Sequence, residues 1–315
     1  MRRSVFLGGM GSAFLASSCK SELPEIRIAL NPWPGYMFVD LAQRRGFFAA
    51  EGIKVKTLFV SSLSDVVQTY QRGQSDIIAS SLIEALTISE KTSRPLRIFR
   101  VADSSSGADV LMARPGISSV AELKGKRVAA EPQSNDMITL HYGLKSAGLK
   151  ISDVQHVPLV QQAALEPDKA KTLGAIQTYP PFSSDWEKRF GFKKIYDSSS
   201  YPGIILDVLS IDRAMDRKYP ELSAQVSRAY NAALVWFLAN RKEGAEQMLA
   251  TVKAVDPSSN ATAADYDMSG LKIYDDAEQA AFFSGGSLAK SIAGYGEIML
   301  AEKMLSRTIA AKEVL

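Results

Sequence analysis

The sequence has little of what reactive sites are usually built from. Its 315 residues include one cysteine, Cys19, and two histidines, His141 and His156. A single cysteine can form no intrachain disulfide and has no partner for dithiol chemistry. A zinc site would have to be built almost wholly from carboxylates, which zinc seldom uses alone. We therefore expect no metal and no cofactor.

An excess of one charge and long apolar runs are missing as well. The formal net charge is +3, and two of the positive charges are Arg2 and Arg3 at the very start. No dense basic patch follows, which argues against a nucleic-acid partner. After residue 20 no apolar stretch is long enough to cross a bilayer. With 46% hydrophobic and 23% charged residues, the composition is that of an ordinary globular protein.

Motifs of common enzymes are not found. No phosphate-binding glycine motif or Gly-x-Ser-x-Gly elbow occurs in a suitable context. His141 falls in the middle of a predicted helix and His156 in a short predicted strand, so neither lies in a loop at a strand end. A histidine base is therefore not expected, although a pair of carboxylates remains a possible substitute.

The first residues are predicted to be an export signal, residues 1–18. Arg2 and Arg3 precede an uncharged, mildly apolar segment, and the order Arg-Arg-Ser-Val-Phe-Leu is typical of twin-arginine signals. The general secretory route stays open as an alternative. Either route places the mature protein outside the cytoplasm.

The leader ends in a pattern typical of a lipoprotein. Residues 15–19 read Leu-Ala-Ser-Ser-Cys, which resembles a bacterial lipobox with Ala16 where leucine is usual. This favours lipidation of Cys19 and a membrane anchor, with residues 19–25 as a tether. The alternative is an ordinary signal peptide in which Cys19 is only a small apolar residue.

Strand-like and helix-like segments alternate through the first part of the mature chain, which predicts an α/β fold with largely parallel strands. Strands are predicted at 26–30, 53–60, 75–79 and 96–102, and helices at 37–50, 64–72 and 83–91.

A second unit of the same kind begins near residue 109. Its strands are predicted at 110–113, 127–130, 155–157, 173–177 and 193–196, and its helices at 119–122, 134–147, 160–171 and 182–190. An apolar segment at 204–210 and helices at 220–240, 242–252 and 288–311 follow. We predict two lobes, 26–105 with 205–315 and 106–204, joined near 103–109 and again near 198–205.

Ligands of such sheets bind at the carboxyl ends of strands. Five loops hold these positions, at 31–37, 80–84, 103–109, 131–136 and 178–182. The candidate ligand-binding residues are Trp33, Tyr36, Ser80, Ser81, Ser106, Asp109, Glu131, Ser134, Asn135 and Tyr179, with Asp207 inside the apolar segment.

Several candidates have a structural alternative. Trp33 packs either on a ligand or on its own lobe. Ser80 or Ser81 with Glu84 is explained by helix capping alone, and about half of the polar residues at 131–136 are expected to be caps. Asp207 needs a partner if it is buried, which is either another side chain or the ligand.

Ordered segments resemble the substrate-binding proteins of nitrate/sulfonate/taurine-type ABC importers. They are residues 31–36 (Asn-Pro-Trp-Pro-Gly-Tyr), 41–52, 73–78, 104–109, 120–128, 179–182 (Tyr-Pro-Pro-Phe) and 202–209. Binding proteins for thiamine precursors and riboflavin share the pattern. The chain departs from it at Met37 and Pro180, where many relatives have glutamate.

The resemblance implies a two-lobed, flytrap-like (type II) periplasmic-binding-protein fold and no enzymatic activity. It implies a monomer that delivers a small polar organic solute to an ABC permease and ATPase. The acids Asp109, Glu131 and Asp207 favour a nitrogen-bearing, neutral or cationic solute over a sulfonate. Helix N-termini leave an anion open. A periplasmic sensor subunit and an enzyme resembling pyrimidine-precursor synthases are the alternative functions.

Overall fold

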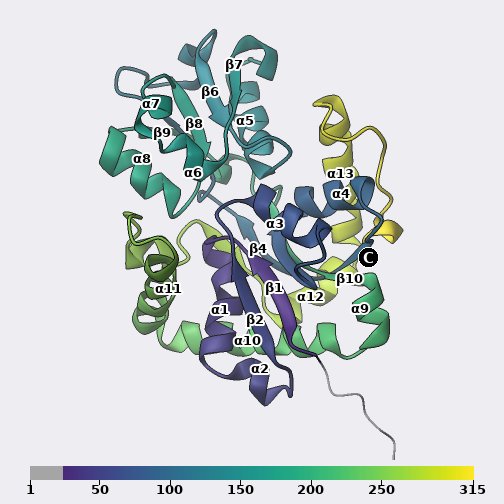
Figure 1. Cartoon of the computed structure of the whole chain (residues 1–315). Coiled ribbons are helices and arrows are strands. Elements are labelled where there is room, and N and C mark those ends of the chain that lie inside the picture. Colours follow the sequence, from purple (N-terminus) through teal and green to yellow (C-terminus); the bar gives the residue numbers. More distant parts are fainter. Residues whose placement is uncertain (1–23) are drawn as a thin grey trace, which may run out of the picture.

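A computed structural model describes residues 24–315 of the chain, which fold into two lobes, each with its own sheet (Figure 1). The predicted export signal, with Arg2 and Arg3, and the predicted lipidation site Cys19 lie outside the described residues. No helix among the described residues is both long and apolar enough to span a membrane.

The first lobe is built on a six-stranded sheet. Its strands, in spatial order, are β11 (Leu271–Ile273), β4 (Leu96–Ser105), β10 (Leu206–Asp212), β3 (Ile77–Ser81), β1 (Ile26–Leu30) and β2 (Val55–Phe59). The α-helices of this lobe are α1 (Met37–Arg44), α2 (Phe47–Ala50), α3 (Leu63–Gln71), α4 (Leu82–Lys91), α9 (Arg213–Lys218), α10 (Leu222–Ala239), α11 (Arg241–Val255), α12 (Asp276–Phe283) and α13 (Ser287–Ala301). Short 3-10 turns are η1 (Pro34–Tyr36), η5 (Ala263–Tyr266) and η6 (Ala311–Glu313).

The second lobe is built on a five-stranded sheet. Its strands, in spatial order, are β7 (Gln155–Pro158), β6 (Arg127–Ala130), β8 (Ala175–Thr178), β5 (Val110–Ala113) and β9 (Lys193–Asp197). Its α-helices are α5 (Asn135–Ser146), α6 (Gln161–Ala164), α7 (Pro167–Ala170) and α8 (Phe182–Phe190). Its 3-10 turns are η2 (Val120–Leu123), η3 (Ile151–Asp153) and η4 (Ser198–Ser200).

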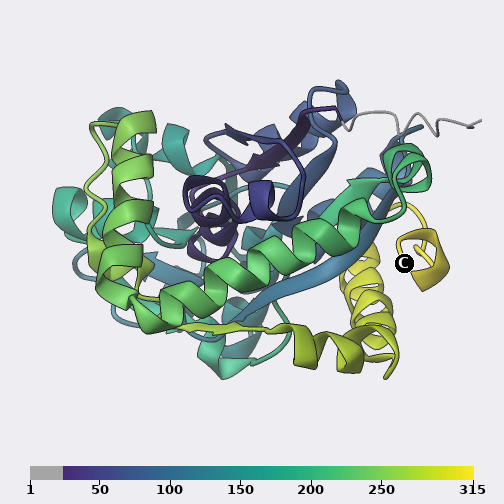
Figure 2. The ribbon, with the colours of Figure 1, turned by 90° about the horizontal axis from the view of Figure 1, so that it is seen from below.

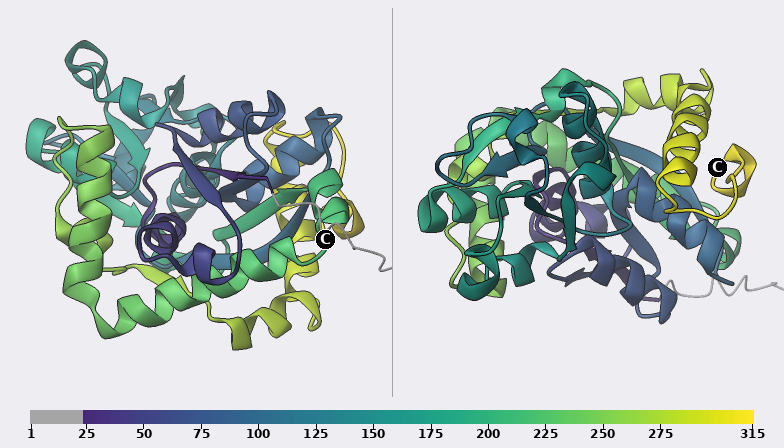
Figure 3. Two further views of the ribbon diagram at one scale, coloured as in Figure 1. Left: turned by 60° about the horizontal axis from the view of Figure 1, so that its bottom comes forward. Right: turned by 90° about the horizontal axis from the view of Figure 1, so that it is seen from above.

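Helices pack on the sheets through apolar faces. Phe38 of α1 contacts Tyr230 and Phe237 of α10, with ring centroids 5.4 and 5.3 Å away. Figure 2 shows α10 lying lengthwise across the first lobe, with α11 turning off at its end. In both views of Figure 3 the C-terminal helix α13 lies at the edge of the first lobe. Just beyond it, Glu302 meets His141 of α5 at 2.7 Å, so this mid-helix histidine has a structural partner.

The expected α/β fold is confirmed, but the expectation of largely parallel strands is wrong. β1 pairs in parallel with β2 and β3, and β6 with β7 and β8. β10 is antiparallel to β3 and β4, β5 is antiparallel to β8 and β9, and the short edge strand β11 is antiparallel to β4. β10 and β5 are each the first strand after a crossing between lobes. The chain enters each sheet there from the cleft side, so these two strands run against their neighbours.

Some predicted helices differ from those observed. The helix expected at 37–50 is two helices, because Gly46 adopts a left-handed φ of 75° between them. The helix at 160–171 is two single turns separated before Pro167. The helix at 288–311 ends at Ala301, and Lys303 has a left-handed φ of 58°. Strand β11 and helices α9 and α12 had no counterpart among the predicted elements.

Candidate ligand-binding site

Strand ends of the first lobe place polar residues at the edge that faces the second lobe. Asn31 follows β1, Ser80 and Ser81 end β3, and Asp103 lies near the end of β4. β10 runs the opposite way, so its start brings Asp207 to the same edge, opposite Asp103 and Ser81. The alternation of strands and helices thus gathers residues that are up to 176 positions apart in the chain.

The second lobe supplies the opposite wall in the same way. Asp109 precedes β5, Glu131 follows β6, and Asn135 begins α5. Tyr179 comes directly after β8. The two lobes therefore meet with their polar strand ends face to face.

A small cavity of about 10 Å³ lies between these edges. It is lined from the first lobe by Asn31, Trp33, Tyr36, Leu63, Ser81 and Asp207, and from the second lobe by Asp109, Asn135 and Tyr179. The lobes touch beside it, since Asn31 Nδ2 donates to the Tyr179 hydroxyl at 3.1 Å and the Trp33 and Tyr179 ring centroids lie 5.6 Å apart. The cavity is thus closed from both sides.

A short, stiff loop presents two of the aromatic rings. Trp33 lies between two prolines and precedes the turn η1, and Tyr36 ends that turn. Proline fixes φ, which limits the freedom of the loop. Residue 35 must be glycine because the loop passes close to Asp103, and a Cβ at this position would lie 1.9 Å from Asp103 Oδ2. The loop therefore holds Trp33 and Tyr36 against the acids of the cleft.

Two acids of the first lobe lie side by side at the cavity. Trp33 Nε1 donates to Asp103 Oδ1 at 3.3 Å, and the Tyr36 hydroxyl donates to Asp207 Oδ1. Asp207 Oδ2 has no hydrogen-bond partner in the described part of the chain. Burial raises the pKa of Asp103 to about 7, and burial together with the charge of Asp103 raises the pKa of Asp207 well above its ordinary value.

In the second lobe, Asp109 is likewise a buried acid, and one of its carboxylate oxygens accepts no hydrogen bond from the described residues. Asp109 Oδ1 accepts a hydrogen bond from Gln177 Nε2 at 3.2 Å, while Asp109 Oδ2 has no partner among residues 24–315. Burial raises the pKa of Asp109 to about 7. Asp109 and Asp207 face the same cavity from opposite lobes, and both are almost fully buried.

Acidic side chains of the chain itself lie at the helix N-termini around the cleft. Glu131 Oε1 accepts from the backbone N–H of Ser64 in the first turn of α3 at 2.8 Å, across the two lobes. Glu84 lies in the first turn of α4, and Asp136 in that of α5. The Ser81 hydroxyl donates to Glu84 Oε2 at 2.5 Å, so Ser81 is the N-cap residue by position but does not cap a backbone amide.

Most of the predicted site residues surround the cavity. Seven of the eleven line it: Trp33, Tyr36, Ser81, Asp109, Asn135, Tyr179 and Asp207. The other four lie elsewhere: Ser80 is buried behind Ser81, Ser106 is exposed at the crossing between lobes, Ser134 caps α5, and Glu131 caps α3.

Three residues of the site were not among the candidates. Asn31 and Leu63 line the cavity, and Asp103 lies beside Asp207 on the neighbouring strand β4. Asp103 carries the same signal that identified Asp207, namely a carboxylate at the end of an apolar strand. Asn31 lies in the loop 31–37, which was predicted to face the ligand, but Asn31 itself was not among the predicted ligand-binding residues.

A comparison with known protein families matches just under half of the chain. Residues 33–185 fit the model of the family described as NMT1/THI5 like. The matched segment contains the aromatic loop, the first crossing between β4 and β5, and Tyr179, so most of the residues that line the cavity lie within it.

Two curated proteins are similar to this chain. The 4-amino-5-hydroxymethyl-2-methylpyrimidine phosphate synthase of Uromyces fabae is 30% identical over 130 residues, which are 39% of this chain and 38% of the enzyme. This chain thus matches well under half of that enzyme's length. A Brucella abortus protein, provisionally named a binding protein, is 23% identical over 260 residues, 81% of this chain and 74% of its own length.

A solved structure supports the fold over nearly the whole chain. The alkanesulfonate-binding protein SsuA of Xanthomonas axonopodis pv. citri, bound to MOPS, superposes with a TM-score of 0.75 at 16% identity. The superposition covers 94% of this chain and 99% of that one. The predicted two-lobed periplasmic-binding-protein fold is thereby confirmed.

Proposed function

We propose that this chain is an extracytoplasmic solute-binding protein that delivers a small polar organic solute to an ABC importer. The observation that carries the proposal is one buried cavity lined by polar side chains of both lobes. A solute held there is in contact with both lobes, so its binding favours the closed arrangement over an open one. The names of the SsuA protein and of the Brucella relative agree with this role.

The lobes we propose to move are residues 26–105 with 205–315 and residues 106–204. The crossings between them are held together at their base, where Ser105 Oγ and Ser198 Oγ lie 2.7 Å apart and the Asp109 N–H donates to Ser105 Oγ at 3.1 Å. Rotation about these crossings would separate Trp33 from Tyr179 and open the cavity.

The proposal is tested with the ligand-free chain in solution. We expect an added solute to lower the radius of gyration measured by X-ray scattering and to be recovered chemically unchanged. Loss of solute uptake on deletion of the gene would then link binding to import. Stabilisation without any uptake defect would favour a sensor subunit instead.

An enzyme remains the second candidate because of the Uromyces fabae synthase. The cavity of this chain has no cysteine, histidine or lysine in its lining, and a base would have to be Asp109 or Asp207. Mass spectrometry of the released solute separates the two roles. A product whose mass differs from that of the added solute would replace the binding proposal by an enzymatic one.

We also propose that the mature protein is anchored to the outside of the membrane by lipid on Cys19, following an export signal at residues 1–18. The support is the order Arg-Arg at residues 2–3 and the lipobox-like residues 15–19. Cells labelled with palmitate should yield labelled wild-type protein and unlabelled Cys19→Ala. An unlabelled wild type would leave an ordinary signal peptide.

A further inference from the structure

The chemistry of the cavity indicates the class of its solute. On the basis of the solute-binding role, we propose that the solute is a compact organic cation with N–H donors, such as a protonated primary amine or an amidinium, held between Asp207 of the first lobe and Asp109 of the second. The Oδ2 atoms of both carboxylates are buried, line or adjoin the cavity, and have no hydrogen-bond partner within residues 24–315.

No side chain of the cavity neutralises these two acids. The nine lining residues include no lysine, arginine or histidine. A carboxylate that is buried and ionised without a partner is strongly destabilised. A cation placed between Asp109 and Asp207 supplies the missing charge to both lobes at once. A metal ion is a poorer occupant, since the described residues contain no group of three or more His, Cys, Asp or Glu arranged to hold one.

Several hydrogen-bond donors at the cavity are engaged already. Trp33 Nε1 donates to Asp103 and the Tyr36 hydroxyl to Asp207 Oδ1, while Gln177 Nε2, behind the wall, donates to Asp109 Oδ1. Four buried acceptor atoms have no donor within residues 24–315, namely Asp109 Oδ2, Asp207 Oδ2, Asn31 Oδ1 and Asn135 Oδ1. These open acceptors favour a solute that brings donors.

An anion lacks a suitable place. Helix N-termini are the usual anion sites of this kind of fold, but here the first turn of α3 is met by Glu131, and Glu84 and Asp136 occupy the first turns of α4 and α5. A sulfonate would have to displace these carboxylates and then lie beside Asp109 and Asp207. Both steps oppose its binding.

Aromatic rings complete the environment of a cation. Trp33 lies 6.4 Å from Tyr36 and 5.6 Å from Tyr179, measured between ring centroids, and all three line the cavity. Rings at such spacing attract cations of every kind, including fully methylated ones. A methylated cation, however, leaves the carboxylate oxygens without hydrogen bonds, so the N–H groups set the selectivity.

The test varies the head group on one carbon skeleton. Ligand-free protein is titrated calorimetrically with n-butylamine, n-butyltrimethylammonium, 1-butanol and butane-1-sulfonate, and with the benzyl counterparts of all four. We expect the amines to bind, and the trimethylammonium compounds to bind more than about tenfold more weakly because they cannot donate hydrogen bonds. The alcohols and sulfonates should not bind measurably.

Variants locate the site. Asp207→Asn and Asp109→Asn should each weaken amine binding by about tenfold or more, since each removes a charged hydrogen-bond acceptor. Both remove a buried charge, so we expect them to fold, and far-ultraviolet circular dichroism checks this. The matched control is Asp76→Asn, on the same sheet but at its opposite end and paired with Arg27, which should leave amine affinity unchanged.

The outcomes separate this inference from the proposed function. Binding of sulfonates without amines would overturn the cation but leave a solute-binding protein. Equal binding of butylamine and butyltrimethylammonium would overturn the need for N–H donors. Amine binding that survives both aspartate substitutions would overturn the site. Failure of every compound to bind would count against the binding protein itself.

Discussion

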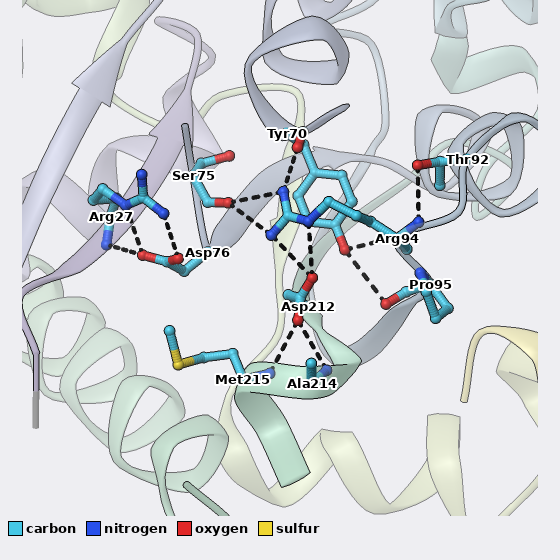
Figure 4. A network of polar contacts seen from close by, with 10 residues as sticks. All are labelled: Arg27, Tyr70, Ser75, Asp76, Thr92, Arg94, Pro95, Asp212, Ala214 and Met215. Atoms are coloured by element: carbon cyan, nitrogen blue, oxygen red, sulfur yellow. Dashed lines mark hydrogen bonds and ion pairs between the residues drawn. The ribbon is translucent and has the colours of Figure 1, made fainter. Parts of the chain in front are cut away.

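Buried acids at the two ends of the first sheet differ in whether they have a cationic partner. Strand β10 carries Asp207 near its start, at the cleft, and Asp212 at its end. Figure 4 shows Asp212 bonded to Arg94, with Nη2 and Oδ2 2.9 Å apart, and to the backbone N–H groups of Ala214 and Met215 at the start of α9. Asp207 accepts a hydrogen bond from Tyr36 and lies beside the Asp103 carboxyl, and no ion pair of Asp207 is found within residues 24–315.

Neighbouring acids follow the same division. At the far end Asp76 is paired with Arg27 and Asp216 with Arg97, each at 2.7 Å. There, burial acts to raise the pKa of Asp216, but hydrogen bonds from Arg97 and Ser223 outweigh it and lower the pKa. At the cleft, burial raises the pKa of Asp103 to about 7. At the far end these acids are paired with arginine, whereas Asp103 and Asp207 at the cleft end have no such partner.

The largest expected effect is a loss of stability with rising pH, which arises from the buried acids at the cleft. Burial raises the pKa of Asp103 and Asp109 to about 7 and that of Glu84 to about 8. The folded protein therefore holds these protons more tightly than the unfolded chain, and the stability they support is complete below about pH 4 and lost as the pH rises through these values. The free energy of unfolding without ligand should fall by at least about 3 kcal/mol from about pH 5 to about pH 8, in urea titrations.

Opening of the lobes limits this loss, because it returns the acids to water. The groups that face them are Glu131, Asp136, Asp207, Tyr36, Tyr179, Tyr230 and, beneath Tyr230, Arg100. The combined variant Asp103→Asn, Asp109→Asn and Glu84→Gln should show a shallower profile over the same pH range, with the remaining slope due to Asp136 and Asp207, whose pKa values burial also raises. A wild-type stability that stays constant or rises toward pH 8 would contradict unpaired acids in the cleft.

The second expected effect is the loss of stability when the Arg94–Asp212 ion pair at the far end of the first sheet is removed. Arg94→Leu leaves Asp212 largely buried without its cation and also removes the hydrogen bonds from Arg94 to Tyr70 O and Ser75 O. Removing one partner of such a pair costs about 3 kcal/mol. Urea unfolding at neutral pH measures the loss. A matched variant, Arg94→Lys, keeps the charge and should lose less, and an equal loss in both would show that the hydrogen-bond geometry matters more than the charge.

The third prediction is that replacing an aspartate by asparagine changes the free energy of unfolding in opposite directions at the two ends of the first sheet. Asp103→Asn removes a buried charge but keeps an acceptor for Trp33, so at about pH 8 it should stabilise the fold by about 2 kcal/mol. At about pH 5, where Asp103 is already protonated, the gain should vanish. Asp216→Asn, which loses the charge that Arg97 needs, should destabilise by about 1 kcal/mol. Destabilisation by both substitutions would remove the distinction between the ends.

Local signals explain which elements could be predicted. Strands 110–113 and 127–130 and the helix 182–190 have the predicted bounds, since each is bordered by clear turn or cap residues. The convergence of five loops was predictable because parallel strands end at one edge. The cavity between the two facing sheet edges is lined by seven of the eleven candidates.

What depended on long-range pairing was not predictable. β10 follows β4 in the sheet only after the chain has passed through the whole second lobe, and no local pattern encodes its antiparallel direction. β11 has three residues and exists because β4 offers it an edge. Asp103 was hidden for the same reason, since its neighbour Asp207 is distant in sequence and adjacent only across the β10–β4 register.

The smallest expected effect lies within the far end itself and separates pairing from burial. Arg27 makes an ion pair with Asp76 as short as those of its neighbours, but its side chain is 38% exposed, against 27% for Arg94. Water screens an exposed pair, so Arg27→Met should cost less than about 1 kcal/mol. The Asp76 carboxylate keeps its hydrogen bond from the Arg27 backbone N–H, which no substitution of the side chain removes. Urea unfolding compares this variant with Arg94→Leu. A loss as large as that of Arg94→Leu would mean that the charge pairing stabilises this end of the sheet irrespective of burial, and the contrast with the cleft would then rest on charge alone.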